Sequence, residues 1–281
     1  MRLIHILTEL WTQPALILPE VHKQICKIVE AHMTGAAHAP EGIALTAPDG
    51  ATPPTWSKVG NVGVVPIKGV LDKRVSTMER SSGGMGLDDI EGSLAEALLD
   101  SDVEGILLDV DSPGGSTTGV PELAAKIRAA AVQKPVVAYT DSLMASAAYW
   151  LASGATAIYA AQSAMVGSIG VYMAWKDTSR ANELAGIKTE LIKVGKYKAA
   201  GVDGIELTDE QRARFQERVD TVAGWFKGAV NKARDGIRAE AMEGQTFFGD
   251  EAVAENLVDA VGTIDDAMVE LNEFIAERKG E

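Results

Sequence analysis

The stretch Val103–Thr140, "VEGILLDVDSPGGSTTGVPELAAKIRAAAVQKPVVAYT", decides the fold. Its run "GILLDV" is apolar without alternation, which predicts a strand buried on both faces. "VPELAAKIRAAAV" predicts a helix with Pro121 near its start, and "KPVVAYT" predicts a second buried strand. A buried strand, a helix and another buried strand in succession indicate an α/β fold with a parallel sheet and right-handed crossovers.

The same alternation of strand and helix patterns continues on both sides of this stretch. We expect further strands at "VGVVPIKGVL" (62–71), "TAIYA" (156–160), "GSIGVYM" (167–173) and "KTELIKVG" (188–195). We expect helices at "GLDDIEGSLAEALLD" (86–100) and after Thr208, which forms a capping box with Gln211. Residues 1–55 are predicted to be an N-terminal helical segment, around Glu20–Met33, followed by a linker rich in Pro, Gly and Ala. Residues 56–281 then form a single domain.

Composition limits the partners of the protein. The 281 residues carry 40 Asp and Glu against 26 Lys and Arg, a net charge of -14. This balance argues against binding to nucleic acid or to an anionic membrane surface, because phosphate contacts need clustered basic side chains. The single cysteine, Cys26, excludes an internal disulfide and is typical of a reducing compartment. We therefore expect a cytoplasmic protein.

The four histidines, His5, His22, His32 and His38, all lie in the first 38 residues. The body of the chain therefore has neither a histidine zinc site nor a histidine general base. No stretch matches the phosphate-binding loop or the dinucleotide-binding glycine pattern. We expect no metal and no cofactor.

An uncharged run from Leu143 to Trp175 is long enough to suggest a membrane span. It is interrupted by glycines and polar residues such as Gly154, Gln162 and Gly170, and it is rich in Ala and Ser. A buried helix followed by buried strands explains it better. The N-terminus shows no signal peptide, since Glu9 and Pro14 break its apolar pattern, and we expect no membrane anchor.

Ser146 lies in this run, within "DSLMASAAYWLASGA", and is either a small packing residue or a nucleophile. A serine nucleophile needs a base, and without histidine that base must be a carboxylate or a lysine whose neutral form is favoured by burial. Three candidates follow in "LIKVGKYKAAG": Lys193, Lys196 and Lys198, between which the spacing does not choose.

Two glycine-containing loops have a similar double interpretation. The glycines of "DSPGGST" either form a simple strand-to-helix turn or direct backbone N–H groups at an oxyanion. Ser168 of "MVGSIG" either completes a turn or orients a catalytic group.

Five stretches together resemble a known family: "GILLDVDSPGG", "MASAAYWLAS", "VGSIGVYMAW", "LAGIKTELIKVGKYKAAG" and "GQTFFGDEAVAENLVDAVG". In this order, and over about Gly60 to Ala267, the chain resembles the signal peptide peptidase A family of the Clp protease and crotonase superfamily. Within that family it is most similar to the phage head-maturation, or capsid assembly, proteases. The resemblance implies a Clp/crotonase-like fold of repeated ββα units with an N-terminal extension, and a homo-oligomer that is a tetramer or larger.

The resemblance also implies roles for individual residues. Ser146 matches the nucleophile, Lys198 the general base 52 residues later, and Ser168 a serine that holds the lysine in place. Gly114 and Gly115 match the loop that supplies N–H groups to the oxyanion hole. The amide of Ala147 matches a second donor. Many members have Gly-Gly after the nucleophile where this chain has Ala147-Ala148, which is expected to narrow the cleft.

The function implied is that of a Ser–Lys endopeptidase of a phage or prophage. Its substrates would be scaffold and capsid or portal proteins inside the procapsid, in the host cytoplasm. A bacterial signal peptide peptidase is the first alternative. A crotonase-like acyl-CoA enzyme and a non-catalytic capsid component are the alternatives from other classes.

Overall fold

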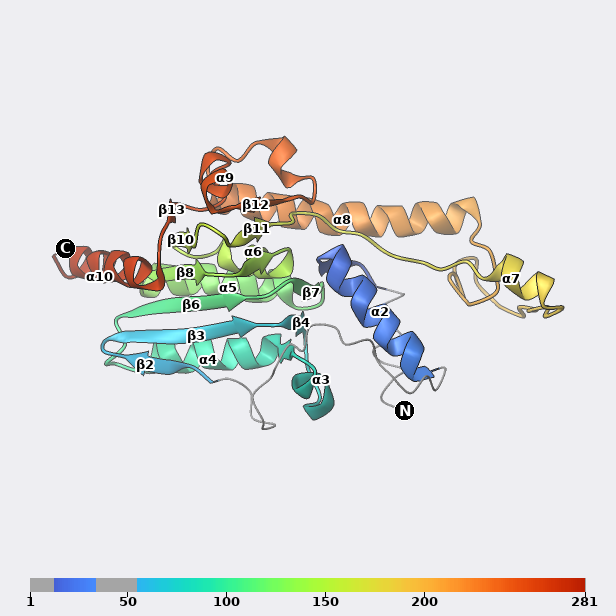
Figure 1. Cartoon of the computed structure of the whole chain (residues 1–281), viewed down its shortest axis with the longest axis horizontal. Coiled ribbons are helices and arrows are strands. Elements are labelled where there is room, and N and C mark those ends of the chain that lie inside the picture. Colours follow the sequence, from blue (N-terminus) through green and yellow to red (C-terminus); the bar gives the residue numbers. More distant parts are fainter. Residues whose placement is uncertain (1–12, 34–54, 281) are drawn as a thin grey trace.

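The computed structural model describes residues 13–33 and 55–280 and confirms an α/β fold built on a six-stranded sheet (Figure 1). The strand order is β13-β10-β8-β6-β3-β2, in which only the edge strand β2 runs antiparallel. The strands of this sheet are β2 (Ser57–Val59), β3 (Val62–Lys68), β6 (Gly105–Asp111), β8 (Val136–Thr140), β10 (Ala157–Ala160) and β13 (Ala260–Val261).

Three of the central strands each continue into a short strand outside the main sheet and then into a helix. The units are β3–β4–α4, with α3 and β5 inserted before the helix, β6–β7–α5 and β8–β9–α6. This repetition confirms the expected ββα units. The added elements are β4 (Val70–Asp72), α3 (Thr77–Ser81), β5 (Gly84–Gly86), α4 (Leu87–Leu99), β7 (Gly114–Ser116), α5 (Val120–Gln133), β9 (Leu143–Ala145) and α6 (Ala147–Ala152).

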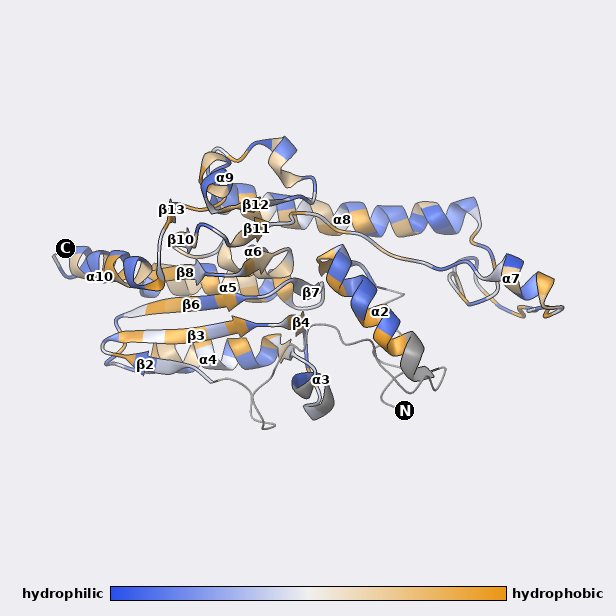
Figure 2. Ribbon diagram, in the orientation of Figure 1, coloured by the Kyte–Doolittle hydropathy of each residue, from blue (hydrophilic) through white to orange (hydrophobic). Residues whose placement is uncertain are grey.

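The main sheet is covered on both faces, which explains its unbroken apolar strands. On one face α4, α5 and α6 enclose the larger core cluster; on the other, α10 (Ile264–Gly280) packs Leu271 and Ile275 against Leu107 and Val137. Figure 2 shows hydrophobic colouring along much of β3 and β6. All six residues of α6 are buried.

The uncharged run forms β9, α6, β10 and β11 (Met165–Gly167) in succession. The prediction of a buried helix and strands is therefore confirmed. Across residues 13–33 and 55–280, no helix has both the length and the apolar character needed to cross a membrane.

The long helix α8 (Asp209–Ala233) begins at the expected capping box, in which Thr208 and Gln211 bond reciprocally. Its C-terminal half anchors α6: Phe226 is fully buried and its ring stacks on Trp150, with centroids 4.7 Å apart and planes 4° from parallel. Its N-terminal half projects past the main sheet together with α7 (Ser179–Leu184) (Figure 1). The elements that follow α8 are η1 (Ala239–Met242), β12 (Thr246–Phe248) and α9 (Gly249–Ala254).

Two predicted strands are wrong. Residues 188–195 form no strand: they are irregular, with Ile192 100% and Val194 95% exposed. The segment 167–173 is a strand only up to Gly167, because Ser168 takes a φ of 51° and turns the chain out of the strand. The predicted strand at 62–71 is two strands, since Gly69 at φ 72° separates β3 from β4.

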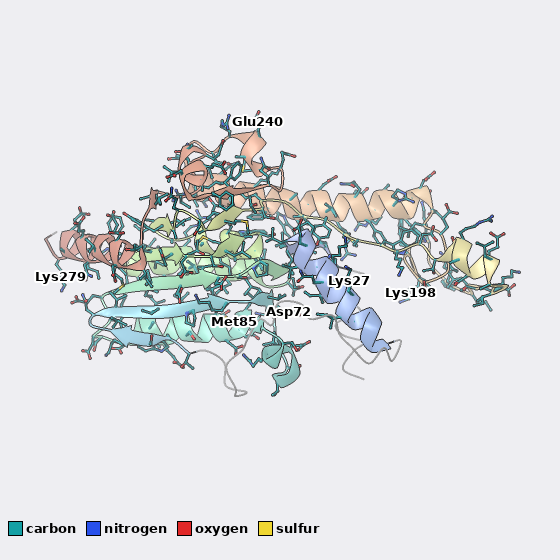
Figure 3. The ribbon with its side chains drawn as sticks, viewed as in Figure 1. Lys27, Asp72, Met85, Lys198, Glu240 and Lys279 are labelled. Atoms are coloured by element: carbon teal, nitrogen blue, oxygen red, sulfur yellow. The ribbon has the colours of Figure 1, made fainter. Side chains whose placement is uncertain are left out.

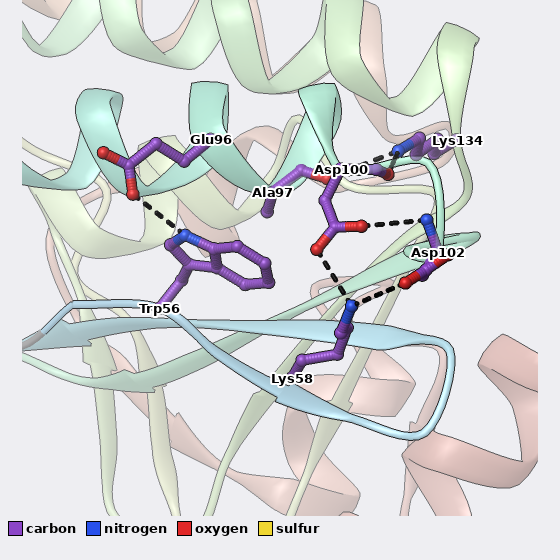
Figure 4. Close-up of polar contacts among 7 residues, drawn as sticks. All are labelled: Trp56, Lys58, Glu96, Ala97, Asp100, Asp102 and Lys134. Carbon is purple, nitrogen blue, oxygen red and sulfur yellow. Dashed lines mark hydrogen bonds and ion pairs between the residues drawn. The ribbon is translucent and has the colours of Figure 1, made fainter.

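The edge of the main sheet is fixed by a small polar cluster shown in Figure 4. Lys58 of β2 bridges the carboxylates of Asp100 and Asp102 at 3.0 and 3.1 Å, and the Lys134 ammonium donates to the carbonyl of Asp100 at 2.9 Å. The Asp100 carboxylate also accepts a hydrogen bond from the backbone N–H of Asp102 at 2.8 Å. This bond, and after it the bond from Lys58, lowers the pKa of Asp100. The cluster closes the turn between α4 and β6.

The N-terminal segment contains β1 (Ala15–Ile17) and α2 (Pro19–Met33), so the predicted helix is confirmed. Its strand is part of the fold: β1 pairs with β7 in a four-stranded sheet of order β1-β7-β4-β5. The predicted linker falls at residues 34–54, outside the described residues. The domain boundary at 55/56 therefore stays a prediction.

We predict that Phe226→Ala lowers the free energy of unfolding by about 3–5 kcal/mol, because it leaves a cavity against Trp150 beneath the helix that begins after Ser146. Trp225→Ala is the matched control, since Trp225 is 55% exposed on the same helix, and it should change stability by less than about 0.5 kcal/mol. Urea unfolding followed by circular dichroism measures both. Equal losses in the two variants would contradict the role given to the stack.

Candidate active site

Ser146 occupies a sharp turn between β9 and α6. Its backbone has φ 55° and ψ −116°, a conformation that costs a non-glycine residue about 1–3 kcal/mol and is maintained only by its surroundings. The Ser146 N–H donates to Gly167 O at 2.8 Å, and its carbonyl accepts from the N–H of Trp150 at 2.9 Å. A serine on a strained strand-to-helix turn is the arrangement that presents a nucleophile.

Ser168 directly follows β11, the strand that neighbours β9, as Ser146 directly follows β9. Parallel pairing of β9 with β11 sets Ala145 opposite Gly167, so each serine directly follows one member of the same pair. Ser168 is also buried at positive φ, and its N–H donates to Gln245 O at 2.7 Å. The antiparallel strand β12 supports this edge through its pairing with β11. The fold thus brings the two predicted serines together.

The glycines of "DSPGGST" form β7 and approach Ser146 closely. A Cβ on Gly114 would collide with the carbonyl oxygen of Leu16 and would stand 2.9 Å from Ala147 N and 3.0 Å from Ser146 Cβ. A Cβ on Gly115 would collide with the carbonyl oxygen of Leu71. Both positions therefore require glycine.

The backbone donors of this loop are not equivalent. The N–H of Gly114 donates to Ser112 Oγ at 3.1 Å, and that hydroxyl donates to Gly69 O at 2.6 Å. Ser112 therefore holds the loop in place, a role that sequence reasoning missed although the residue belongs to the motif. Ala147 is the first residue of α6, where an N–H has no partner within the helix. Ala147 and Gly115 are thus the better placed of the predicted oxyanion donors.

The N-terminal strand β1 lies in this site, which the sequence did not indicate. Leu16 is opposite Gly115 in the antiparallel pairing of β1 with β7. On the other edge, Ala15 exchanges two hydrogen bonds with Tyr172, at 2.8 and 3.3 Å. The Tyr172 hydroxyl lies 2.7 Å from His22 Nδ1, and burial raises the pKa of that hydroxyl, so Tyr172 is neutral.

The structure does not bring Lys198 to Ser146 within one chain. Lys198 is exposed in the irregular segment between α7 and α8, and Figure 3 shows it well away from the site of α6 in Figure 1. Lys196 forms an ion pair with Glu210 at 2.7 Å, which raises its pKa, and Lys193 donates to Lys196 O at 3.3 Å. Among the described residues Lys198 Nζ has no such partner. The assignment of Lys198 as the base stays a prediction.

No group of three or more His, Cys, Asp or Glu side chains with a metal-binding arrangement occurs in the part of the chain that the structure describes. Ser146 is followed by the uncharged, buried side chains of α6 and lies against the backbone of the glycine loop. Such a site suits acyl transfer, for which a nucleophile and oxyanion donors suffice once a base is supplied.

Residues 128–277 match the sequence profile of Peptidase family S49. This chain belongs to Peptidase family S49. The S49 profile spans Ser146, Ser168 and Lys198, while the glycine loop precedes it. The family resemblance carried by the five motifs is thereby confirmed.

The chain is also similar to two phage proteins. The chain is 32% identical over 228 residues to Capsid assembly protease C of Escherichia phage lambda, covering 80% of this chain and 52% of that protein. It is 34% identical over 221 residues to Head-tail preconnector protein GP5 of Enterobacteria phage P21, covering 76% and 44%. The chain thus spans about half the length of these relatives. A probable enoyl-CoA hydratase/isomerase from Mycobacterium abscessus has a TM-score of 0.46 and 12% identity, over 79% of this chain and 73% of that chain.

We predict that Gly114→Ala slows labelling of Ser146 by a fluorophosphonate by about 100-fold or more, because the methyl group fills the space between Ser146 and the Ala147 N–H. Gly92→Ala is the control: it lies on α4, and a Cβ there meets nothing within 4 Å. Mass spectrometry of the labelled protein gives the rates, with circular dichroism to check folding. Labelling of Gly114→Ala at the rate of the control would refute this view of the loop.

Proposed function

We propose that this chain is a serine endopeptidase whose nucleophile is Ser146 and whose general base is Lys198. The observation that carries the proposal is the strained turn at Ser146, held against the glycine loop and the N-terminus of α6. Strained backbone conformations of this kind cluster at active sites and persist only where the surrounding structure enforces them. Membership of a peptidase family supports the same chemistry.

The mechanism that we propose assigns one step to each of these groups. Ser146 Oγ attacks the carbonyl carbon of the scissile bond while its proton passes to neutral Lys198. The N–H groups of Ala147 and Gly115 stabilise the oxyanion, and Ser168 orients the lysine amine. The protonated lysine then gives its proton to the leaving amine, and water hydrolyses the acyl-enzyme by the reverse sequence of transfers.

Because Lys198 lies far from Ser146 of its own chain, we assign the base to a neighbouring copy in a homo-oligomer. The segment that carries Lys198 is unusually apolar for an exposed one, which supports burial against another copy. Its exposed hydrophobic residues are Leu184, Ile187, Ile192, Val194, Tyr197 and Val202. Lys196 is the weaker candidate, since Glu210 stabilises its charged form.

The substrates we propose are scaffold and capsid or portal proteins of a phage or prophage, processed in the host cytoplasm inside the procapsid. The similarity to two phage proteins, one named a capsid assembly protease, supports this assignment. Its test is mass spectrometry of the products after co-expression with the neighbouring scaffold and capsid genes. Cleaved signal peptides as the preferred substrates would instead favour a signal peptide peptidase.

We predict that Ser146→Ala and Lys198→Ala each abolish peptide cleavage with unchanged circular dichroism spectra, because each removes one half of the nucleophile–base pair. Lys196→Ala is the matched control and should keep most of the activity, since its ammonium is engaged by Glu210. A cleavage assay on a denatured protein substrate decides the point. An active Lys198→Ala variant would overturn the assignment of the base.

Co-expression of two inactive variants tests whether the lysine base comes from another copy of the chain. When Ser146→Ala and Lys198→Ala chains are co-expressed, about a quarter of the sites in a random oligomer join an intact serine to an intact lysine of another copy. Activity should therefore return to roughly that fraction of the wild type. If serine and lysine came from the same chain, every site would lack one of them, and the mixture would stay inactive.

A further inference from the structure

The strand β1 occupies the place that an extended substrate would take beside Ser146. It lies between two backbone edges: Gly114–Ser116 on one side, in antiparallel register, and Tyr172 on the other. Pairing of an extended peptide with an exposed strand edge is a general mode of peptide recognition, in which main-chain hydrogen bonds give affinity and alternate side chains give specificity. Here the peptide belongs to the chain itself.

The register directs one particular carbonyl group at the site. Backbone groups of successive residues in a strand point to opposite edges. Ala15 uses both of its groups on Tyr172, whereas Leu18 donates its N–H to Pro113 O at 3.0 Å. Leu16, one residue after Ala15 and two before Leu18, therefore directs its carbonyl oxygen toward Gly115.

The same carbonyl oxygen lies next to Ser146 and Ala147. The point at which a Gly114 Cβ would stand collides with Leu16 O and is 2.9 Å from Ala147 N and 3.0 Å from Ser146 Cβ. The Leu16 carbonyl, the Ser146 side chain and the Ala147 amide thus surround one small space. This is the relation that a scissile carbonyl has to a nucleophile and an oxyanion donor.

The side chain and the flanking residues hold this peptide in place. Leu16 is completely buried and belongs to the main core cluster, so a pocket of the fold encloses it. Thr117 Oγ1 donates to Pro14 O at 2.6 Å, and the Arg218 guanidinium donates to the Gln13 side chain at 2.9 Å. These two contacts hold the residues before Leu16, and the bond from the Leu18 N–H to Pro113 O holds the chain after it.

We propose that the Leu16–Ile17 peptide bond is a self-cleavage site, with Leu16 in the pocket for the residue that precedes the scissile bond. This inference rests on the proposed peptidase function. Ser146 Oγ attacks the Leu16 carbonyl carbon, the bond to the Ile17 nitrogen breaks, and the lysine supplies the proton to that amine. Water then releases Leu16 as a free carboxylate. The chain from Ile17 onward remains, with a new α-amino group.

Self-cleavage also sets the specificity and the accessibility of the site. The groove is filled by β1 until the bond is cut and the fragment that ends at Leu16 dissociates. Other substrates then bind in the same extended form, and the pocket that encloses Leu16 selects a leucine-sized apolar side chain. An unpaired charge in that pocket would be strongly disfavoured.

The experiment is intact-mass and N-terminal analysis of the purified full chain, tagged at its C-terminus. Wild type should lose the residues before Ile17 with time, and Ser146→Ala should keep them. Leu16→Asp should slow this cleavage by about 100-fold, because the carboxylate would be buried without a partner. Ile28→Asp is the matched control, since Ile28 is 45% exposed on α2 of the same segment, and it should cleave as wild type does.

A synthetic peptide of residues 11–22, "WTQPALILPEVH", serves as a second probe. Wild-type protein that has already cleaved itself should cut this peptide between Leu16 and Ile17. An intact Leu16–Ile17 bond in a preparation that digests another protein through Ser146 would overturn self-cleavage and leave the proposed function standing. An intact bond in a preparation that digests nothing and resists fluorophosphonate would overturn both. Cleavage that persists in Ser146→Ala would assign the cut to a contaminating protease.

Discussion

The close approach of Gly114 to the turn at Ser146 is the constraint on which the rest of the site depends. Three backbones meet there, from β7, from the β9–α6 turn and from β1, and a single methyl group on Gly114 would collide with them. The unfavourable φ and ψ of Ser146 are maintained because its N–H is fixed by Gly167 and its helix is buried throughout. The stack of Trp150 on Phe226 then links this turn to α8.

The parts of the fold that were predictable are those in which local pattern and burial coincide. β6 and β8 are buried on both faces and are therefore continuous apolar runs, and α8 begins with reciprocal side-chain caps that are written in the sequence. The predicted strand at 188–195 is wrong because its apolar residues Ile192 and Val194 are exposed, and an apolar pattern in the sequence does not show whether its residues are buried. The pairing of β1 with β7 was also unpredictable, since it joins segments about a hundred residues apart.

In the candidate site, too, some features could be predicted from the sequence and others are visible only in the structure. Ser146, Ser168 and the glycines could be proposed from their motifs, and the fold assembles them through the register of β9 with β11 and the position of β7. A positive φ at a serine has no signature in one sequence, so the strained turn became visible only in three dimensions. Spacing left three lysines open. The ion pair of Lys196 with Glu210 argues against Lys196, because a lysine that is held in its charged form is a poor base, and the choice of Lys198 over Lys193 rests on the family resemblance.

The groove and the lysine segment together suggest how such an enzyme would stay inactive before assembly. In the proposed mechanism, an isolated copy would have a nucleophile without a base, because Lys198 lies far from Ser146 of the same chain. It would also hold β1 in the proposed substrate position without the means to cut it. If a second copy supplies the lysine, the first bond within its reach is the one already seated beside Ser146, and cleavage of Leu16–Ile17 would follow assembly rather than precede it. The contact between the Lys198 segment and a neighbouring copy would then first form the oligomer and afterwards open the groove. The exposed apolar residues around Lys198 would bind the neighbour and deliver the base in the same step.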